Sequence, residues 1–267
     1  MVIDFHAHIF PDKVAEKATD SISRFYENTP MAYRGHVDTL INSGDKIGVV
    51  AYVVHSTATK PEQVANINTY IIGECSKQKK FIGFGTLHPD CDINLQEIDR
   101  LLQNKIHGIK LHPDFQTFQF DTPKMDAVYD RLSEVGMPIL VHAGDYRYDF
   151  SGPQRIANVI KKFPKLKIVA AHFGGYTQWE DSMKYLVGKR VWFDTSSTLW
   201  KLPVDKADEM IRKHGVENFF FGSDYPMWDH QDELNRFNKL TLTDSEREKI
   251  LLTNALGFLD MKVEDFS

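Results

Sequence analysis

Two histidines one residue apart end the first apolar run of the chain, and their spacing could support metal chemistry. The run is VIDFHAH at residues 2–8, so His6 and His8 occupy positions i and i+2. In a β-strand both side chains point to one face of the sheet, whereas Phe5 and Ala7 point to the other. Two imidazoles on one face can hold a single cation, and a pair of hydrogen-bonded core histidines is the alternative interpretation.

Further polar residues follow later apolar runs in the same way, and small or turn-forming residues come after them, as in LVHAG, AAHFGG and FGSDYP. The polar residues that end the eight runs are, in chain order, His6 and His8, His55, His88, Lys110 and His112, His142, His172, Asp194, and Asp224. Imidazole and carboxylate ligands suit Zn²⁺, although ligand type alone does not exclude iron, manganese or cobalt. Such an ion lowers the pKa of bound water to about 7. A neighbouring carboxylate or imidazole can then move the proton.

The elements that must position these residues alternate regularly along the chain. Short apolar runs predict strands at 2–5, 49–54, 81–87, 108–111, 138–141, 167–171, 190–194 and 218–222, and helical spacing predicts helices between them, for example at 92–105, 123–136 and 152–164. Continuous apolar strands that alternate with helices predict a parallel sheet covered on both faces. Eight such units in 267 residues are typical of a (β/α)₈ TIM barrel, an α/β fold.

The barrel is expected to form a single domain over residues 1–267, with an insertion after the first strand at 10–34 and terminal helices at 241–267. No Gly-x-Gly-x-x-Gly turn follows the first strand, which weakens the alternative of an open dinucleotide-binding sheet. Because barrel enzymes carry their chemistry at the carboxyl ends of the strands, the polar residues named above are expected to converge at one mouth.

The amino-acid composition limits the kinds of molecule that the protein is expected to bind. The formal net charge of −5, with acidic and basic residues mixed throughout, offers no basic stripe for nucleic acid. The two cysteines form no Cys-x-x-Cys motif, and no run approaches the ~20 apolar residues of a membrane span. We therefore expect a cytoplasmic protein that acts on a small molecule and binds neither nucleic acid nor a membrane. A homodimer is compatible with the many aromatic residues, although no pattern demands one.

In this order, the motifs DFHAH, GIKLHP, VHAG, AHFGG and GSDYP resemble the amidohydrolase superfamily, and in particular its amidohydrolase-2 branch, which includes aminocarboxymuconate-semialdehyde decarboxylase-like proteins. The resemblance extends over nearly the whole chain. It implies one divalent metal ion, expected to be Zn²⁺, held by His6, His8, His142 and Asp224. It further implies that His172 orients or protonates the metal-bound water or the substrate, and that Asp224 also takes part in proton transfer.

Three residues near the predicted metal are candidates for substrate binding. Lys110 occupies the place where binuclear amidohydrolases carry a carboxylated lysine that bridges two metals. Because no additional carboxylate accompanies it, we favour one metal and a free Lys110 that offers its cation to a substrate carboxylate or phosphate. His112 shares the strand face of Lys110, and His55 ends the second strand. For His55, a histidine satisfied by neighbouring backbone is an equal alternative.

The predicted function is metal-dependent hydrolysis of a small-molecule amide, ester or lactone by a metal-activated water. The main alternative is non-oxidative decarboxylation of a small aromatic or unsaturated carboxylic acid at the same mononuclear site. Phosphoesterases and nucleases of the TatD or PHP type also begin with His-x-His, but they need further carboxylate and histidine ligands where this chain has lysine. A metal-binding scaffold without activity is a fourth hypothesis, which predicts a metal with no open coordination position.

Overall fold

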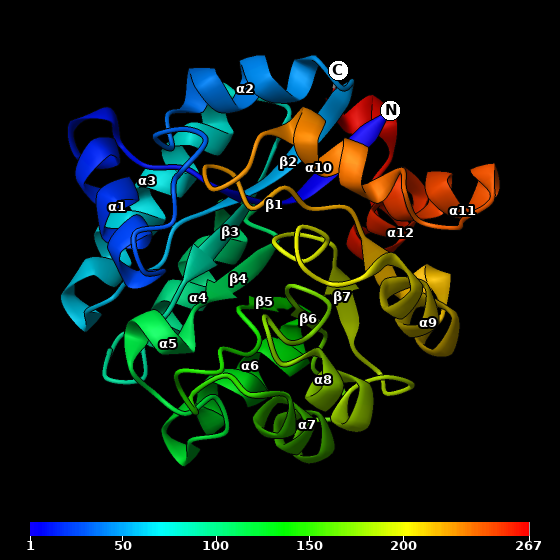
Figure 1. Cartoon of the computed structure of the whole chain (residues 1–267). Helices are drawn as coiled ribbons and strands as arrows, with labels where there is room; N and C mark the ends of the chain where they lie inside the picture. Colours follow the sequence, from blue (N-terminus) through cyan, green and yellow to red (C-terminus); the bar gives the residue numbers. More distant parts are fainter. Residues whose placement is uncertain (267) are drawn as a thin grey trace.

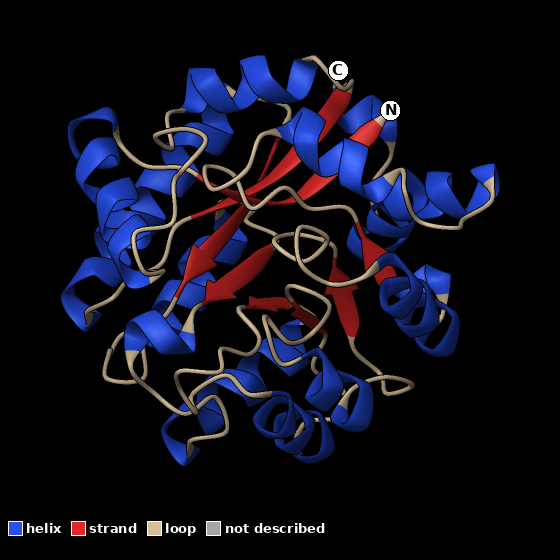
Figure 2. Cartoon of the chain, in the orientation of Figure 1, coloured by secondary structure: helices blue, strands red, loops and turns tan. Residues whose placement is uncertain are grey.

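The protein is a TIM barrel in a single domain, described by a computed structural model over residues 1–266. Within these residues eight parallel strands pair in the order of the chain, and Figure 2 shows them as a central ring surrounded by helices. The strands are β1 (Val2–His8), β2 (Val49–His55), β3 (Phe81–Thr86), β4 (Gly108–Leu111), β5 (Ile139–Val141), β6 (Ile168–Ala170), β7 (Trp192–Asp194) and β8 (Phe219–Phe220). The fold predicted from the alternating pattern is therefore confirmed.

The helices cover the outside of the ring, as Figure 1 shows. They are α1 (Asp12–Phe25), α2 (Val37–Asp45), α3 (Val64–Lys77), α4 (Asn94–Gln103), α5 (Pro113–Gln116), α6 (Asp126–Val135), α7 (Pro153–Lys162), α8 (Trp179–Tyr185), α9 (Val204–His214), α10 (His230–Phe237), α11 (Asp244–Glu248) and α12 (Asn254–Leu259). Helix α6 stops where Gly136 adopts φ +71°, a left-handed conformation that glycine tolerates best. No helix among the described residues is long and apolar enough to cross a membrane.

Backbone hydrogen bonds between the first and last strands bring the barrel close to closure. The Phe5 amide donates to the Phe221 carbonyl at 2.8 Å, and the His8 amide donates to the Tyr225 carbonyl at 2.7 Å. Inside, the rings of Phe5 and Phe220 stack with centroids 4.3 Å apart. Phe258 of α12 lies edge-on to Phe5, so the terminal helices pack against the barrel interior as the sequence predicts.

Strand β1 contains an irregularity that changes which side chains face inward. Asp4 pairs with Tyr52 and Ala7 with Val54, so three steps along β1 match two steps along β2. This extra residue is the signature of a β-bulge. The prediction that Phe5 faces the surrounding helices is wrong, because the bulge breaks the strict alternation and turns Phe5 into the barrel interior.

Candidate metal centre and active site

The carboxyl ends of the strands enclose a small polar cavity. Its lining includes His6, His8, Lys110, His112, His142, His172 and Asp224, so the structure brings all the predicted metal and catalytic residues to one place. About 20 Å³ of the cavity is open to the centre of a water molecule, which suffices for a single ion or a water. Tyr26, Pro226 and Met227 are buried and also line it.

Three donor atoms of the predicted ligand set lie close together in this cavity. Asp224 Oδ1 is 3.4 Å from His6 Nε2 and 3.4 Å from His8 Nε2. Ligands bound tetrahedrally to Zn²⁺ at ~2.0–2.1 Å stand about 3.3–3.4 Å apart. The two distances from Asp224 Oδ1 are therefore those expected for a divalent ion between strand β1 and the loop after β8.

The fourth predicted ligand, His142, follows β5 and has a different environment. Its Nδ1 lies 3.0 Å from His172 Nε2, and its ring stacks on His112 with centroids 3.9 Å apart. Its Nε2 is buried without a hydrogen-bond partner and lies 3.9 Å from Asp114 Oδ2. Donor atoms of His112, Asp114 and His142 all lie within 4.8 Å of one another, so His142 belongs to a second group of ligand-type side chains. Its assignment to the same ion as His6 stays a prediction.

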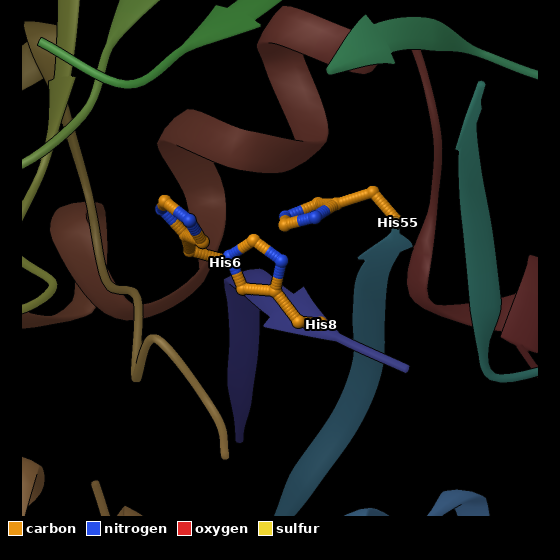
Figure 3. Close-up of side chains that lie close together, drawn as sticks. All are labelled: His6, His8 and His55. Carbon is orange, nitrogen blue, oxygen red and sulfur yellow. The ribbon is translucent and has the colours of Figure 1, made fainter. Parts of the chain in front are cut away.

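His55, at the end of β2, lies next to His6 and His8. Figure 3 shows its ring, carried by β2, beside those of His6 and His8, and their donor atoms fall within 4.8 Å of one another. The His55 ring is edge-on to His8 at 4.4 Å, and both of its buried nitrogens have no hydrogen-bond partner. His55 does not line the central cavity, and its predicted role in substrate binding stays a prediction.

Asp194, which ends β7, and Ser196, which follows it, hold two of the site histidines in place. Asp194 Oδ2 is 2.8 Å from His6 Nδ1, which leaves His6 Nε2 to face the cavity. Asp194 Oδ1 accepts the backbone amide of His172 at 3.0 Å and the Ser196 hydroxyl at 2.5 Å. Ser196 Oγ also lies 2.9 Å from His172 Nδ1. A carboxylate behind a ligating histidine fixes its tautomer and ring orientation.

Burial sets the charge of the site. It lowers the pKa of His6 and of His142 well below the ordinary histidine value, and the neighbouring Lys110 lowers both further. Neutral imidazoles are the form that binds a metal. Burial by itself raises the pKa of Asp224, but His6 and His8 outweigh it and hold this pKa well below its usual range, so the carboxylate is ionised.

Lys110 is fully buried on β4 and contacts His6, one of the predicted metal ligands. Its Nζ lies 2.9 Å from His6 Nε2. Burial lowers the pKa of Lys110 to about 8, while the carboxylates of Asp224 and Asp194 oppose this shift. Lys110 is therefore mostly cationic at neutral pH, in a cavity that also contains the ionised Asp224.

Two of the proposed catalytic residues have strained backbones. His172 has φ +61° and Asp224 has φ +58°, in the left-handed region that side chains other than glycine adopt uncommonly. Each such residue costs about 1–3 kcal/mol and persists only where the surroundings enforce it. Their backbone amides are held by Asp194 Oδ1 and by the His6 carbonyl, at 3.0 Å and 2.9 Å.

The residues therefore fit a divalent metal ion. The unpartnered nitrogens of His55 and His142 are buried polar atoms, which are costly unless something binds them. Sequence reasoning assigned no role to Asp194, Ser196 or Tyr26, whose hydroxyl lies 3.1 Å from His112 Nε2. Asp194 ends a predicted strand, and this position could have indicated that it belongs to the site. Tyr26 lies in the insertion after the first strand, where no sequence pattern indicated a role.

Fold and site together define a metal-dependent TIM-barrel enzyme. The amidohydrolase family profile, of the amidohydrolase-2 branch, matches residues 3–261, and the chain belongs to this family. No curated protein sequence matches the chain.

Solved structures of similar fold include two decarboxylases and one hydrolase, each under 20% identical. The 5-carboxyvanillate decarboxylase of Novosphingobium aromaticivorans, with bound manganese, has a TM-score of 0.77 at 16% identity over 98% of this chain and 97% of that chain. A dihydroxybenzoic acid decarboxylase from Polaromonas, also with manganese, has 0.76 at 14% identity over 99% and 98%. A Pseudomonas putida protein assigned as a 2-pyrone-4,6-dicarboxylic acid hydrolase has 0.68 at 17% identity over 97% of each chain.

Proposed function

We propose that the protein hydrolyses a small-molecule amide, ester or lactone with the help of one divalent metal ion. The observation that carries this proposal is the convergence of His6, His8 and Asp224 next to His172 in a single cavity. His142 completes the proposed ligand set. When bound, the ion supplies Lewis acidity and hydroxide at neutral pH.

The side chains have distinct proposed roles in the reaction. Asp224 is ionised, so its carboxylate is ready to accept the proton of an attacking water. His172 orients the substrate and donates a proton to the leaving amine or alkoxide. Lys110 keeps its cation in a water-poor cavity and pairs with negative charge on the substrate. His112 stacks on His142 and lines the same cavity, where it contacts the substrate.

Zn²⁺ is the proposed metal, supported by the histidine and carboxylate donors and by the 3.4 Å distances from Asp224 Oδ1 to His6 Nε2 and His8 Nε2. Manganese, present in the two decarboxylase structures, is the competing metal. Metal analysis of protein purified without added metal decides between them. One ion per chain supports a free Lys110, whereas two ions per chain would make it a bridging ligand.

Non-oxidative decarboxylation is the second candidate, and the buried cation of Lys110 favours it. A cation beside the metal ligands suits a substrate carboxylate, and decarboxylases are among the similar structures. In that reaction the same site would supply a proton to the carbon that loses CO₂.

The two reactions are separated by giving metal-loaded protein a panel of esters, lactones and amides in parallel with carboxylated phenols. Product acid without CO₂ supports hydrolysis, and CO₂ release from the phenols supports decarboxylation. His172→Gln, which removes the proposed proton donor, should lower kcat in either case by about 100-fold or more. An unchanged rate in this variant would contradict the assigned role. The proposed cytoplasmic location is tested separately by cell fractionation.

A further inference from the structure

A second and much larger cavity adjoins the metal site. It is a groove of about 1140 Å³ between α1, α3 and α5, which lie together on the left of Figure 1. His8, Ile22 and Phe115 line both this groove and the central cavity, so the two spaces are neighbours. Ligand sites usually measure ~300–1,000 Å³. The groove is therefore large enough for a substrate, whereas the central cavity holds little more than an ion or a water.

The positions of the lining residues indicate where a substrate must extend. Tyr26, Pro226 and Met227 are buried, whereas Ile22 and Phe115 are half-buried at the boundary with the groove. An organic substrate with its reacting group at Asp224 cannot fit into the central cavity alone. The half-buried pair lines both spaces, so it marks the boundary across which a larger substrate would extend into the groove.

The lining of the groove is mostly apolar. Its larger apolar side chains are Val14, Ile22 and Phe25 of α1, Ile67 and Tyr70 of α3, Phe115 of α5, and Phe10, Tyr148 and Phe150 of the loops. Thr57 and Asp114 also line it, and each has one buried side-chain oxygen without a hydrogen-bond partner, Thr57 Oγ1 and Asp114 Oδ1. These residues follow β2 and β4 at the end of the barrel that carries the metal site. Unpartnered buried polar atoms are costly, so a ligand group that reached these oxygens would be stabilised there.

We propose that this groove binds the apolar arm of the substrate, an acyl chain or aryl group, with a hydrogen-bonding group near its reacting end. The arm leaves the metal site between Ile22 and Phe115, and its polar group contacts Thr57 and Asp114. The inference rests on the proposed metal-dependent function, because the reacting end is placed at that site. It deepens the function by naming an elongated, largely apolar ester or amide as the substrate class.

Hydroxamates of different length test the groove, because their head group binds divalent metals. Calorimetry is done on metal-loaded protein with acetohydroxamate and with octanohydroxamate. Each buried methylene tightens binding about fourfold. With part of the chain buried in the groove, the longer compound should bind at least about tenfold more tightly.

A matched pair of variants locates the binding of the chain. Ser21 lies on α1 and lines the groove, whereas Ser245 lies on α11 and is exposed away from it. Ser21→Trp should remove the advantage of octanohydroxamate and leave the Kd of acetohydroxamate unchanged. Ser245→Trp should behave as the wild type in both titrations.

Equal affinities for the two hydroxamates, or an advantage that survives Ser21→Trp, would overturn the groove as a substrate site. Failure of acetohydroxamate to bind would instead count against the metal centre. If acetohydroxamate does not bind, octanohydroxamate that binds to the wild type but not to Ser21→Trp still supports the groove as a substrate site. If octanohydroxamate does not bind either, the groove is rejected as a substrate site. Light scattering runs in parallel, and a change of oligomeric state in Ser21→Trp would reassign the groove to a contact between copies of the chain.

Discussion

Among single residues, Asp194 has the greatest influence on how the site is prepared for a metal. Its two carboxylate oxygens reach the ring of His6 and the backbone of His172, at 2.8 Å and 3.0 Å. One side chain on β7 thus positions histidines that come from β1 and from the end of β6. Its effect passes through these histidines, so Asp194 is a positioning residue.

Asp194→Asn should weaken metal binding by about 10- to 100-fold, because an amide can donate to His6 Nδ1 and move the proton to Nε2. Competition with a chromophoric chelator measures the affinity directly. Asp92→Asn, which changes an exposed carboxylate, is the control and should bind as the wild type. An unaltered affinity in Asp194→Asn would show that the tautomer of His6 is set elsewhere.

Glu233 of α10 makes stability depend on pH. Burial raises its pKa to about 8, although Arg236 opposes this shift. Because the folded pKa lies above the unfolded value of 4.5, stability is fully present below pH 4.5 and is lost as the pH rises through 8. Glu233→Gln should gain stability relative to the wild type between these limits, by at most about 1.4 kcal/mol per pH unit.

Urea denaturation at pH 5, 7 and 8.5 measures this difference. Glu264→Gln, on an exposed side chain near the C-terminus, should show no pH-dependent difference. If Glu233→Gln and the wild type keep the same relative stability at every pH, the carboxyl of Glu233 is ionised throughout.

At the scale of elements, the bulge in β1 orients the proposed metal ligands His6 and His8. Asp4 precedes it and accepts the backbone amides of His6 and Ser223 at 3.1 Å and 2.8 Å. It also lies 3.0 Å from Nε2 of the buried His230 on α10. Asp4 therefore joins the bulge to the loop that carries Asp224.

Asp4→Ala should lower the free energy of unfolding by on the order of 3 kcal/mol, because several buried donors lose their acceptor. It should also weaken metal binding, since both ligand-bearing segments lose their common support. Denaturation and metal titration check the two effects, with Asp92→Ala as the exposed control. A destabilised variant with wild-type metal affinity would restrict Asp4 to a structural role.

At the scale of the whole molecule, the proposed ion would join the two ends of the sheet. His6 and His8 lie on β1, and Asp224 follows β8, where few backbone bonds close the barrel. A ligand that binds only the folded state stabilises it according to its concentration relative to Kd. Metal at 100 times its Kd should thus contribute about 2.7 kcal/mol.

Removal of the metal with a chelator should lower Tm by roughly 5–10 °C under that condition. Differential scanning calorimetry measures the change, and restoring the ion should reverse it. Asp224→Ala should show a smaller response to the metal because it lacks one proposed ligand. Identical Tm values with and without metal would contradict a site between β1 and β8.

The sequence predicted the barrel because its signals are local. Each signal is a pattern that spans only a few residues. The signals are apolar runs of strand length, residues that start or stop helices, and polar residues at strand ends. The same rule collected His6, His8, Lys110, His142 and Asp224 at one mouth, and the structure does place them around one cavity. The predicted orientation of Phe5 was wrong, because the bulge arises from the pairing of β1 with β2 and not from a local pattern.

By itself, the sequence determined the eightfold alternation and the set of ligand-type side chains that a barrel carries to its mouth. Only the tertiary structure decided which of them meet: that His6 and His8 face Asp224, that His142 pairs with His172, and that Asp194 stands behind His6. The groove beside α1 also arises only from packing. The physical reason is that donor spacing and cavity shape depend on contacts between segments far apart in the chain, as for Asp4 and His230 with a separation of 226 residues.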